Sequence, residues 1–205
     1  MSTARKFATL FLLTGAIVAH PSRGSATTIA LYTFQNLSVG VGTPLTNVAP
    51  DVGPAGFLAA FASSPTAGAF QVAAFQPNPL FSGNSLVEPQ GSGGNTLTVT
   101  LNAAVTGVSV DFATNGAGAV TFASSAGSVT VTSTAQGGLF PGGILTFSSG
   151  TPFTSFTLSA GASPEFAIDN LSLTTAVPEP ASMLLLGTGL VGVGARRWRN
   201  RRQRG

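Results

Sequence analysis

Few residues of this chain could carry out chemistry, and their types exclude several reaction classes. The 205 residues include no Cys and a single His, His20. Residues 27–176 contain no His, Lys or Arg. A hydroxyl nucleophile therefore has no Ser–His or Ser–Lys partner there, and thiol catalysis and Cys-based zinc sites are excluded by composition. Hydrolysis through an activated nucleophile is not expected of this region.

Three carboxylates keep one hydrolytic chemistry formally open. Asp111, Glu165 and Asp169 could act as a glycosidase pair if two of them faced a cleft about 5–10 Å apart. Such sites normally hold the sugar against Trp or Tyr, and residues 27–176 contain no Trp and only Tyr32. We therefore predict that the protein is not an enzyme.

The same oxygen donors suggest a metal site instead. Asp169 and Asn170 are adjacent hard-oxygen ligands, and Asp111, Glu165 and loop carbonyls could complete the roughly six to eight ligands of Ca²⁺. No EF-hand-like spacing accompanies them. The alternative is that Asp169 and Asn170 bond to the backbone in a strand bulge, while the other acidic residues lie on the solvent face. Apart from this calcium site, no cofactor is expected.

The charge distribution divides the chain into three parts. All nine basic residues lie near the ends, none of them between Arg23 and Arg196. Residues 27–176 carry five acidic residues and no basic one, a formal charge of −5. Phosphate binding requires cations, so this part is not expected to bind nucleic acid. With 43% hydrophobic and 7% charged residues in the whole chain, the central part has enough apolar sequence for one folded domain.

Residues 1–26 have the layout of a secretory signal peptide. Residues 1–6 are positively charged and residues 7–19 form an apolar run, after which small residues precede a cleavage site between Ala26 and Thr27. The apolar run is shorter than the about 20 residues that span a membrane, which favours cleavage over a retained anchor. The Sec export machinery is the expected partner.

Residues 177–205 combine a short motif, an apolar helix and a basic tail. The helix, 181–195, would be about 22 Å long against about 30 Å of hydrocarbon, a shortfall that bilayer thinning and snorkelling arginines can absorb. The arginines that follow favour a cytoplasmic end, which leaves the central domain outside. The motif residues are Val177, Pro178, Glu179 and Pro180, and the basic anchor is Arg196, Arg197, Arg199, Arg201, Arg202 and Arg204.

This arrangement resembles the PEP-CTERM protein-sorting signal of Gram-negative bacteria. The resemblance rests on the motif 177–180, the helix 181–195 and the basic tail 196–205, and it covers only this end of the chain. It implies that an exosortase-type membrane protease recognises and removes the segment, in cells that make exopolysaccharide. The protein would lie in the inner membrane with a cytoplasmic C-terminus before processing, and reach the cell surface or the medium afterwards. A permanent single-pass anchor is the alternative.

The central part, 27–176, has the pattern of short antiparallel strands. From residue 96 onward, apolar and polar residues alternate with the period of a half-buried strand, and turn signals such as Gly150-Thr151-Pro152 separate the runs. We predict an all-β antiparallel sandwich of jelly-roll type, between an N-terminal signal helix and a C-terminal transmembrane helix. The apolar pairs that mark the strands are Leu97/Val99, Val108/Val110, Val120/Phe122, Val129/Val131, Leu145/Phe147, Phe156/Leu158 and Phe166/Ile168.

The first half of this domain is less regular. Residues 28–35 and 68–75 are typical of strands. Most of 40–66 and 76–95 is predicted as loop because proline is excluded from central strands, with a short helix near Phe57–Phe61. Phenylalanines in loop-rich segments are expected to be buried anchors rather than a binding patch, namely Phe57, Phe61, Phe75, Phe81 and Phe140.

The last predicted strand contains a change of phase. Leu171 and Leu173 restore the alternation one residue late after Phe166 and Ile168. A bulge at Asp169-Asn170 would keep both apolar pairs facing inward.

The two terminal segments and the lack of catalytic residue types lead to one functional expectation. The protein is predicted to be an exported cell-surface or extracellular-matrix protein with a structural or adhesive role linked to exopolysaccharide or biofilm. The alternatives are a carbohydrate- or calcium-binding jelly-roll module and, after these, a glycan-acting enzyme.

Overall fold

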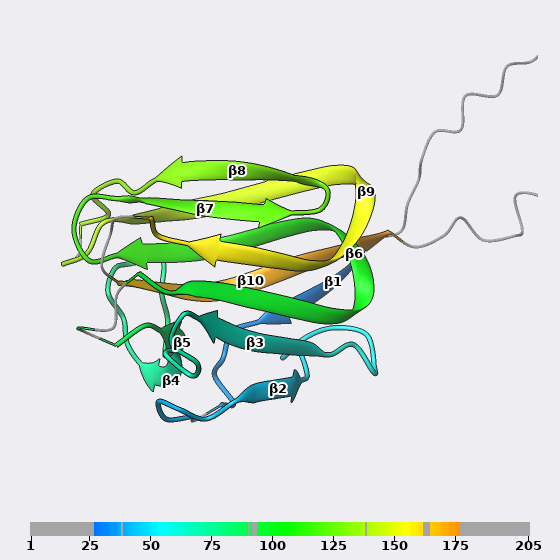
Figure 1. The fold of residues 1–205 in the computed structure, drawn as a ribbon, viewed down its shortest axis with the longest axis horizontal. Coiled ribbons are helices and arrows are strands. Elements are labelled where there is room, and N and C mark those ends of the chain that lie inside the picture. Colours follow the sequence, from blue (N-terminus) through cyan, green and yellow to red (C-terminus); the bar gives the residue numbers. More distant parts are fainter. Residues whose placement is uncertain are drawn as a thin grey trace, which may run out of the picture.

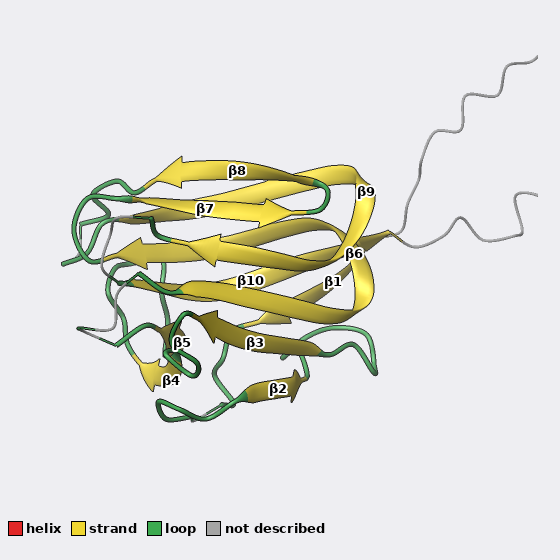
Figure 2. Ribbon diagram, viewed as in Figure 1, coloured by secondary structure: helices red, strands yellow, loops and turns green. Residues whose placement is uncertain are grey.

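The computed structural model describes residues 27–37, 39–89, 91, 94–137, 139–161 and 165–176, and every helix or strand element in these ranges is a strand (Figures 1 and 2). All pairings between strands are antiparallel, which confirms the predicted all-β antiparallel fold. The predicted signal and transmembrane helices lie outside the described residues. The strands are β1 Thr27–Tyr32, β2 Leu45–Val48, β3 Ala59–Ser64, β4 Gln71–Ala74, β5 Asn84–Val87, β6 Thr96–Thr114, β7 Ala119–Ser124, β8 Gly127–Thr132, β9 Gly142–Ser159 and β10 Phe166–Ala176.

Two long strands, β6 and β9, run through both layers of the sandwich. The first half of β6 pairs with β3 and with the second half of β9, whereas the second half of β6 pairs with β10 and with the first half of β9. Register shifts between Thr100 and Gly107 mark the bend between the layers. Across the layers, the ring of Phe122 on β7 stacks on Phe147 in the first half of β9, with centroids 4.5 Å apart.

The turn predicted at residues 150–152 is wrong, because β9 continues through it. Gly107 pairs with Ser148 and Val105 pairs with Phe153, so several residues of β9 lie opposite one residue of β6. Pro152 therefore stands where the regular hydrogen-bond ladder is interrupted, and its missing N–H costs no ladder bond. The turn signal marks a bend within a strand.

Alternation along the strands places one face of each layer in the core. On β6, Leu97, Val99 and Leu101 are at most 5% exposed, and the threonines between them face outward. The strand registers align hydroxyl side chains in a row across five strands of one outer face, from Ser64 through Thr96, Ser159 and Thr121 to Thr130. This face therefore presents hydroxyl and methyl groups without charge.

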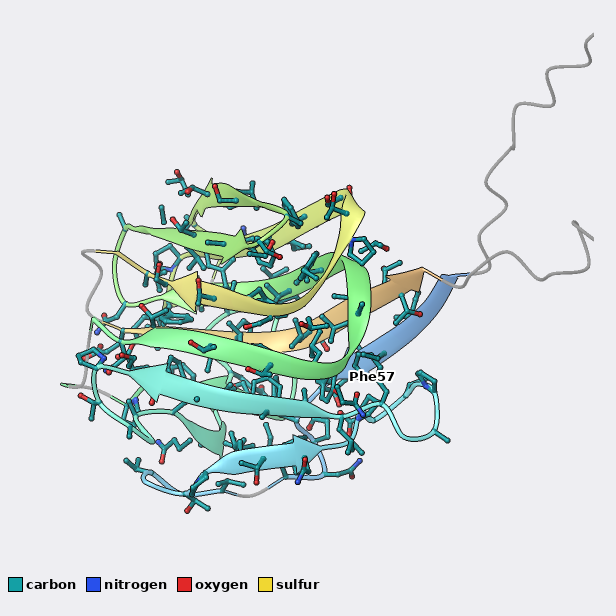
Figure 3. All side chains as sticks on the ribbon, turned by 45° about the vertical axis from the view of Figure 1, so that its right-hand side comes forward. Phe57 is labelled. Atoms are coloured by element: carbon teal, nitrogen blue, oxygen red, sulfur yellow. The ribbon has the colours of Figure 1, made fainter. Side chains whose placement is uncertain are left out.

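The first half of the domain contains more strand than its prolines suggested. β2, β3 and β5 lie in segments predicted as loop, and the helix predicted near Phe57–Phe61 is wrong. Phe61 belongs to β3, which pairs with β6, and its ring packs edge to face against Tyr32 and Phe34. Phe57 precedes β3 and is buried in the core (Figure 3), as expected of a loop anchor. Pairing with β6 makes Ala59–Ser64 a strand, and the prolines of this region lie before or after its strands.

The expected bulge is present in β10. Its register against β6 shifts between Asp169 and Ser172, and Asn170 has a φ of 49°, in the left-handed region. Asparagine adopts this conformation more readily than most residues. The extra residue keeps both apolar pairs in the core, because the side chains before and after the bulge are at most 2% exposed: Phe166, Ile168, Leu171 and Leu173.

The two ends of the described domain lie together. Thr27 at the start of β1 pairs with Ala176 at the end of β10, and the two strands lie side by side in Figure 1. β10 has 11 residues, which at about 3.3 Å per residue gives about 36 Å from this end to the start of the strand. Whatever lies near Phe166 is therefore remote from both ends.

Candidate functional site

A pocket of about 300 Å³ lies at the start of β10, at the end of the sandwich remote from Thr27 and Ala176. Part of its wall is apolar. The rings of Phe75 and Phe140 lie 5.8 Å apart at an angle of 50°, and Pro77 and Pro89 add further apolar surface. The polar wall contains two carboxyl groups and two side-chain amides, from Glu88, Glu165, Gln71 and Asn115.

Glu165, directly before β10, is held by amide donors. It is 8% exposed. Its Oε1 accepts a hydrogen bond from the backbone N–H of Gly91, and its Oε2 accepts one from Nδ2 of Asn115. Its backbone carbonyl accepts the N–H of Asn115 at 3.0 Å. Both carboxyl oxygens therefore have partners, and the side chain is fixed at the pocket.

Glu88, directly after β5, is more deeply buried and less well satisfied. It is 3% exposed, and its Oε1 accepts hydrogen bonds from the backbone N–H of Asn95 at 3.2 Å and from Nδ2 of Asn95 at 2.7 Å. Its Oε2 has no hydrogen-bond partner among the described residues. Burial raises the pKa of Glu88 against the lowering effect of the Asn95 bonds, and the charge of Glu165 raises it further. The pocket thus contains a buried acid with one unsatisfied oxygen.

Strand pairing brings these two acids to the same pocket. The backbone N–H of Glu88 donates to the carbonyl of Phe166 at 3.0 Å, next to Glu165. This continues the pairing of β5 with β10, where Val87 lies opposite Ala167. Two carboxyl groups, two amides and two phenyl rings around one small cavity form an arrangement that suits a small polar ligand with an apolar part.

The predicted site at Asp169 and Asn170 is a separate cluster in the bulge of β10. Asp169 is fully buried, and its oxygens accept the backbone N–H groups of Ser82 at 3.0 Å and Asn170 at 2.7 Å. Nδ2 of Asn170 donates to Asp111 Oδ2 at 2.9 Å and to the carbonyl of Leu80 at 3.3 Å. The bonds with backbone groups of Ser82, Asn170 and Leu80 match the backbone-bonded alternative, whereas the bond to Asp111 joins two side chains. Within the described ranges, no group of three or more His, Asp or Glu side chains is arranged to hold a metal ion, and calcium binding here stays a prediction.

Burial controls the ionisation of this cluster. It raises the pKa of Asp169 to about 6, against the bonds from Ser82 and Asn170 that lower it, and the charges of Asp111 and Asp51 raise it further. Burial also raises the pKa of Asp111, against the lowering effect of its bond from Asn170.

The structure separates Glu165 from the other two carboxylates considered for glycan cleavage. Asp111 and Asp169 lie opposite each other on β6 and β10, whereas Glu165 lines the pocket with Glu88. The expectation that the remaining acids lie on the solvent face is wrong for Glu88 and Glu165, which are buried and bonded to amide donors. Sequence reasoning missed Glu88 and Asn115. The available signal was an acid beside Pro89 in a domain without any basic residue to pair with it.

The predicted sorting and cleavage residues lie outside the described residues, apart from Thr27. This holds for Ala26, for the motif 177–180 and for the basic tail 196–205. No helix in the part of the chain that the structure describes is long and apolar enough to span a membrane.

Comparison with known families bears on this C-terminal segment. The family model of the PEP-CTERM protein-sorting motif matches residues 176–202, from the last residue of β10 into the arginine-rich tail. The chain carries a PEP-CTERM sorting motif. The motif implies an exported protein that is anchored by its C-terminal region before an exosortase-type protease processes it.

The chain also resembles solved structures at low sequence identity. No curated protein matches its sequence. Among solved structures, it resembles a family 6 carbohydrate-binding module at 19% identity, over 57% of this chain and 87% of that one, with a TM-score of 0.36. A family 29 carbohydrate-binding module variant complexed with mannohexaose matches at 13% identity, over 74% of this chain and 93% of that one, with a TM-score of 0.41. The enzymatically active domain of a bacteriophage CBA120 tailspike protein matches at 15% identity, over 60% of this chain and 20% of that one, with a TM-score of 0.32.

Proposed function

We propose that this protein is exported through the Sec machinery, cut between Ala26 and Thr27, and released from its C-terminal anchor at the PEP-CTERM motif by an exosortase-type protease. The β-sandwich then acts at the cell surface or in the extracellular matrix. The observation that carries the proposal is the match of the sorting motif to residues 176–202, at the end of β10.

The arrangement of the domain supports this order of events. Because Thr27 pairs with Ala176, both terminal segments join the sandwich at the same end. A C-terminal anchor with arginines in the cytoplasm would hold this end towards the inner membrane. The pocket at Glu88 and Glu165, about 36 Å along β10, would then face away from the membrane.

The chemistry of the surface supports a structural or adhesive role among exopolysaccharide chains. The domain has no basic residue, and one outer face presents rows of hydroxyl and methyl groups across five strands. Such a face can exchange hydrogen bonds with neutral polysaccharide hydroxyls without desolvating a charge. The pocket favours a second candidate function, that of a ligand-binding module on the same exported scaffold.

Mass spectrometry of both termini tests the export proposal in the bacterium that encodes the full chain. We expect a mature protein that begins at Thr27, lacks the arginines of 196–205, and fractionates with the envelope or the extracellular polymer. Substitution of Glu179→Ala in the motif should leave the tail attached and keep the protein in the membrane fraction. Gly150→Ala on β9, where an added Cβ meets open space, serves as the control and should be processed like the wild type. A wild-type protein that keeps its arginine tail in the membrane would instead be a permanently anchored one.

A further inference from the structure

Strand β8 leaves one of its two edges without a neighbouring strand. Within the described ranges, Gly127–Thr132 is hydrogen-bonded to β7 alone. Figure 1 shows β8 near the upper border of the sandwich. Alternate residues of an edge strand point their N–H and C=O groups away from the strand that they pair with. This edge therefore offers a row of backbone donors and acceptors that fits a further extended strand.

The borders of the sheet at β1, β2 and β4 differ from this edge. Leu31 of β1 forms a bridge with Val52, and Val72 of β4 forms one with Val39. β2 has four residues and an irregular register against β3. Proteins protect an edge strand with charge, proline, a bulge or a covering segment. β8 has neither charge nor proline, and its six residues pair with β7 in unbroken register.

Two copies of the chain can meet at β8 without charge repulsion. The domain has a formal charge of −5, but the sequence contains no charged residue between Asp111 and Glu165, a range that includes β7, β8 and β9. Like charges opposite each other destabilise a strand pair, and none would face each other here. In the sheet, β6, β9 and β7 separate β8 from β10, the strand that leads to the sorting motif.

The side chains of β8 have the same order in both directions. The run from Ser128 through Val129, Thr130 and Val131 to Thr132 reads hydroxyl, valine, hydroxyl, valine, hydroxyl from either end. Directly opposite residues of an antiparallel pair project from the same face. With Thr130 opposite its own copy, Val129 would face the second copy's Val131. Because the valines pack half-buried against the core and the hydroxyl residues are exposed, this register continues both faces of the sheet.

We propose that β8 is a dimerisation edge, at which a second copy of this chain adds its own β8 in antiparallel pairing about a twofold axis at Thr130. Identical strands paired in this way form an isologous contact, which closes as a dimer. The rows of hydroxyl groups on the outer face then continue from one copy into the other. Since the pairing requires neither processing at the sorting motif nor a polysaccharide, this proposal and the proposed function can fail separately.

Disulfide trapping tests the proposal with the full chain in mild detergent, because the wild type contains no Cys. Thr130→Cys would place two thiols opposite each other, at the Cα separation of about 4.5–5.5 Å that paired strands have and disulfides accept. The matched control is Thr100→Cys, which is exposed on the same outer face but lies on β6, between β3 and β9.

Under oxidation with copper phenanthroline, we expect Thr130→Cys to form a covalent dimer about tenfold faster than Thr100→Cys, because only the thiols at β8 are held together. Equal rates in the two variants would overturn the proposal, since random encounter or association through the terminal segments would produce them.

An added charge at the edge gives a second measurement. Thr130→Lys would put two ammonium groups opposite each other, whereas Thr100→Lys adds the same charge away from the edge. Sedimentation equilibrium in the same detergent should show a concentration-dependent dimer for the wild type and Thr100→Lys, and a dissociation constant about tenfold higher for Thr130→Lys. A wild type that stays monomeric at every concentration, or a Thr130→Lys variant that dimerises like the wild type, would contradict pairing at β8.

Discussion

Asp169→Asn should remove a pH dependence of stability that runs opposite to ordinary acid denaturation. Burial raises the pKa of Asp169 from an ordinary 3.8 to about 6, despite two backbone hydrogen bonds. The folded state therefore binds this proton more tightly than the unfolded state. The contribution of Asp169 to the free energy of unfolding is fully present below about pH 3.8 and is lost as the pH rises through 6. The difference in pKa corresponds to about 3 kcal/mol of unfolding free energy.

Acidification does not destabilise the domain by breaking ion pairs, because residues 27–176 contain no basic side chain. Burial also raises the pKa values of Glu88 and Asp111, so they contribute with the same sign. Urea unfolding followed by circular dichroism, at several pH values between 4 and 7, measures the effect. The wild type should be most stable at the acidic end, and Asp169→Asn should reduce the difference in unfolding free energy between pH 4 and pH 7 by about 2 kcal/mol. A wild type that gains stability from pH 4 to 7, or a variant with the wild-type slope, would refute the reasoning.

Three further substitutions test the packing. Gly142→Ala should cost about 1–3 kcal/mol, because a Cβ there would overlap a backbone carbonyl and a buried amide, whereas Gly150→Ala on the same strand has open space and should unfold in urea like the wild type. Phe122→Ala should lose about 3–5 kcal/mol in the same assay, since its fully buried ring contacts three other rings. Asn170→Ala should be less stable than Asn170→Gly by about 1 kcal/mol, because both lose the side-chain bonds but only alanine is strained at a φ of 49°; equal midpoints would contradict this.

The strands that carry strong alternation were predictable from the sequence. The runs around Val120 and Phe156 bury alternate residues, and the run around Val129 half-buries Val129 and Val131 between exposed residues. The bulge in β10 was predictable for the same reason, because a change of phase between two apolar pairs must be absorbed by an extra residue. β3 was not predictable from the sequence, since the Ala-rich segment Ala59–Ser64 becomes a strand through its pairing with β6.

Local sequence patterns did not predict the candidate pocket. Glu165 was considered as a possible acid, but its neighbour Glu88 was not, and no spacing rule connects them. Asp169 was expected to bond locally, and its bond to Asn170 is local, yet its second bond is to Ser82, 87 residues away. Neither the burial of Glu88 and Asp169 nor the raised pKa of each of these two groups follows from its own segment of sequence.

The sequence alone predicts the terminal segments. It also determines the separation of basic ends from an acidic centre and the faces of the regular strands, because charge runs and side-chain periodicity are properties of neighbouring residues. Only the tertiary structure decides which acids share a pocket, which oxygen lacks a partner and which loop segments become strands. The physical reason is that these features come from strand pairings between distant segments, such as β5 with β10, whose register is set by packing across the whole sandwich.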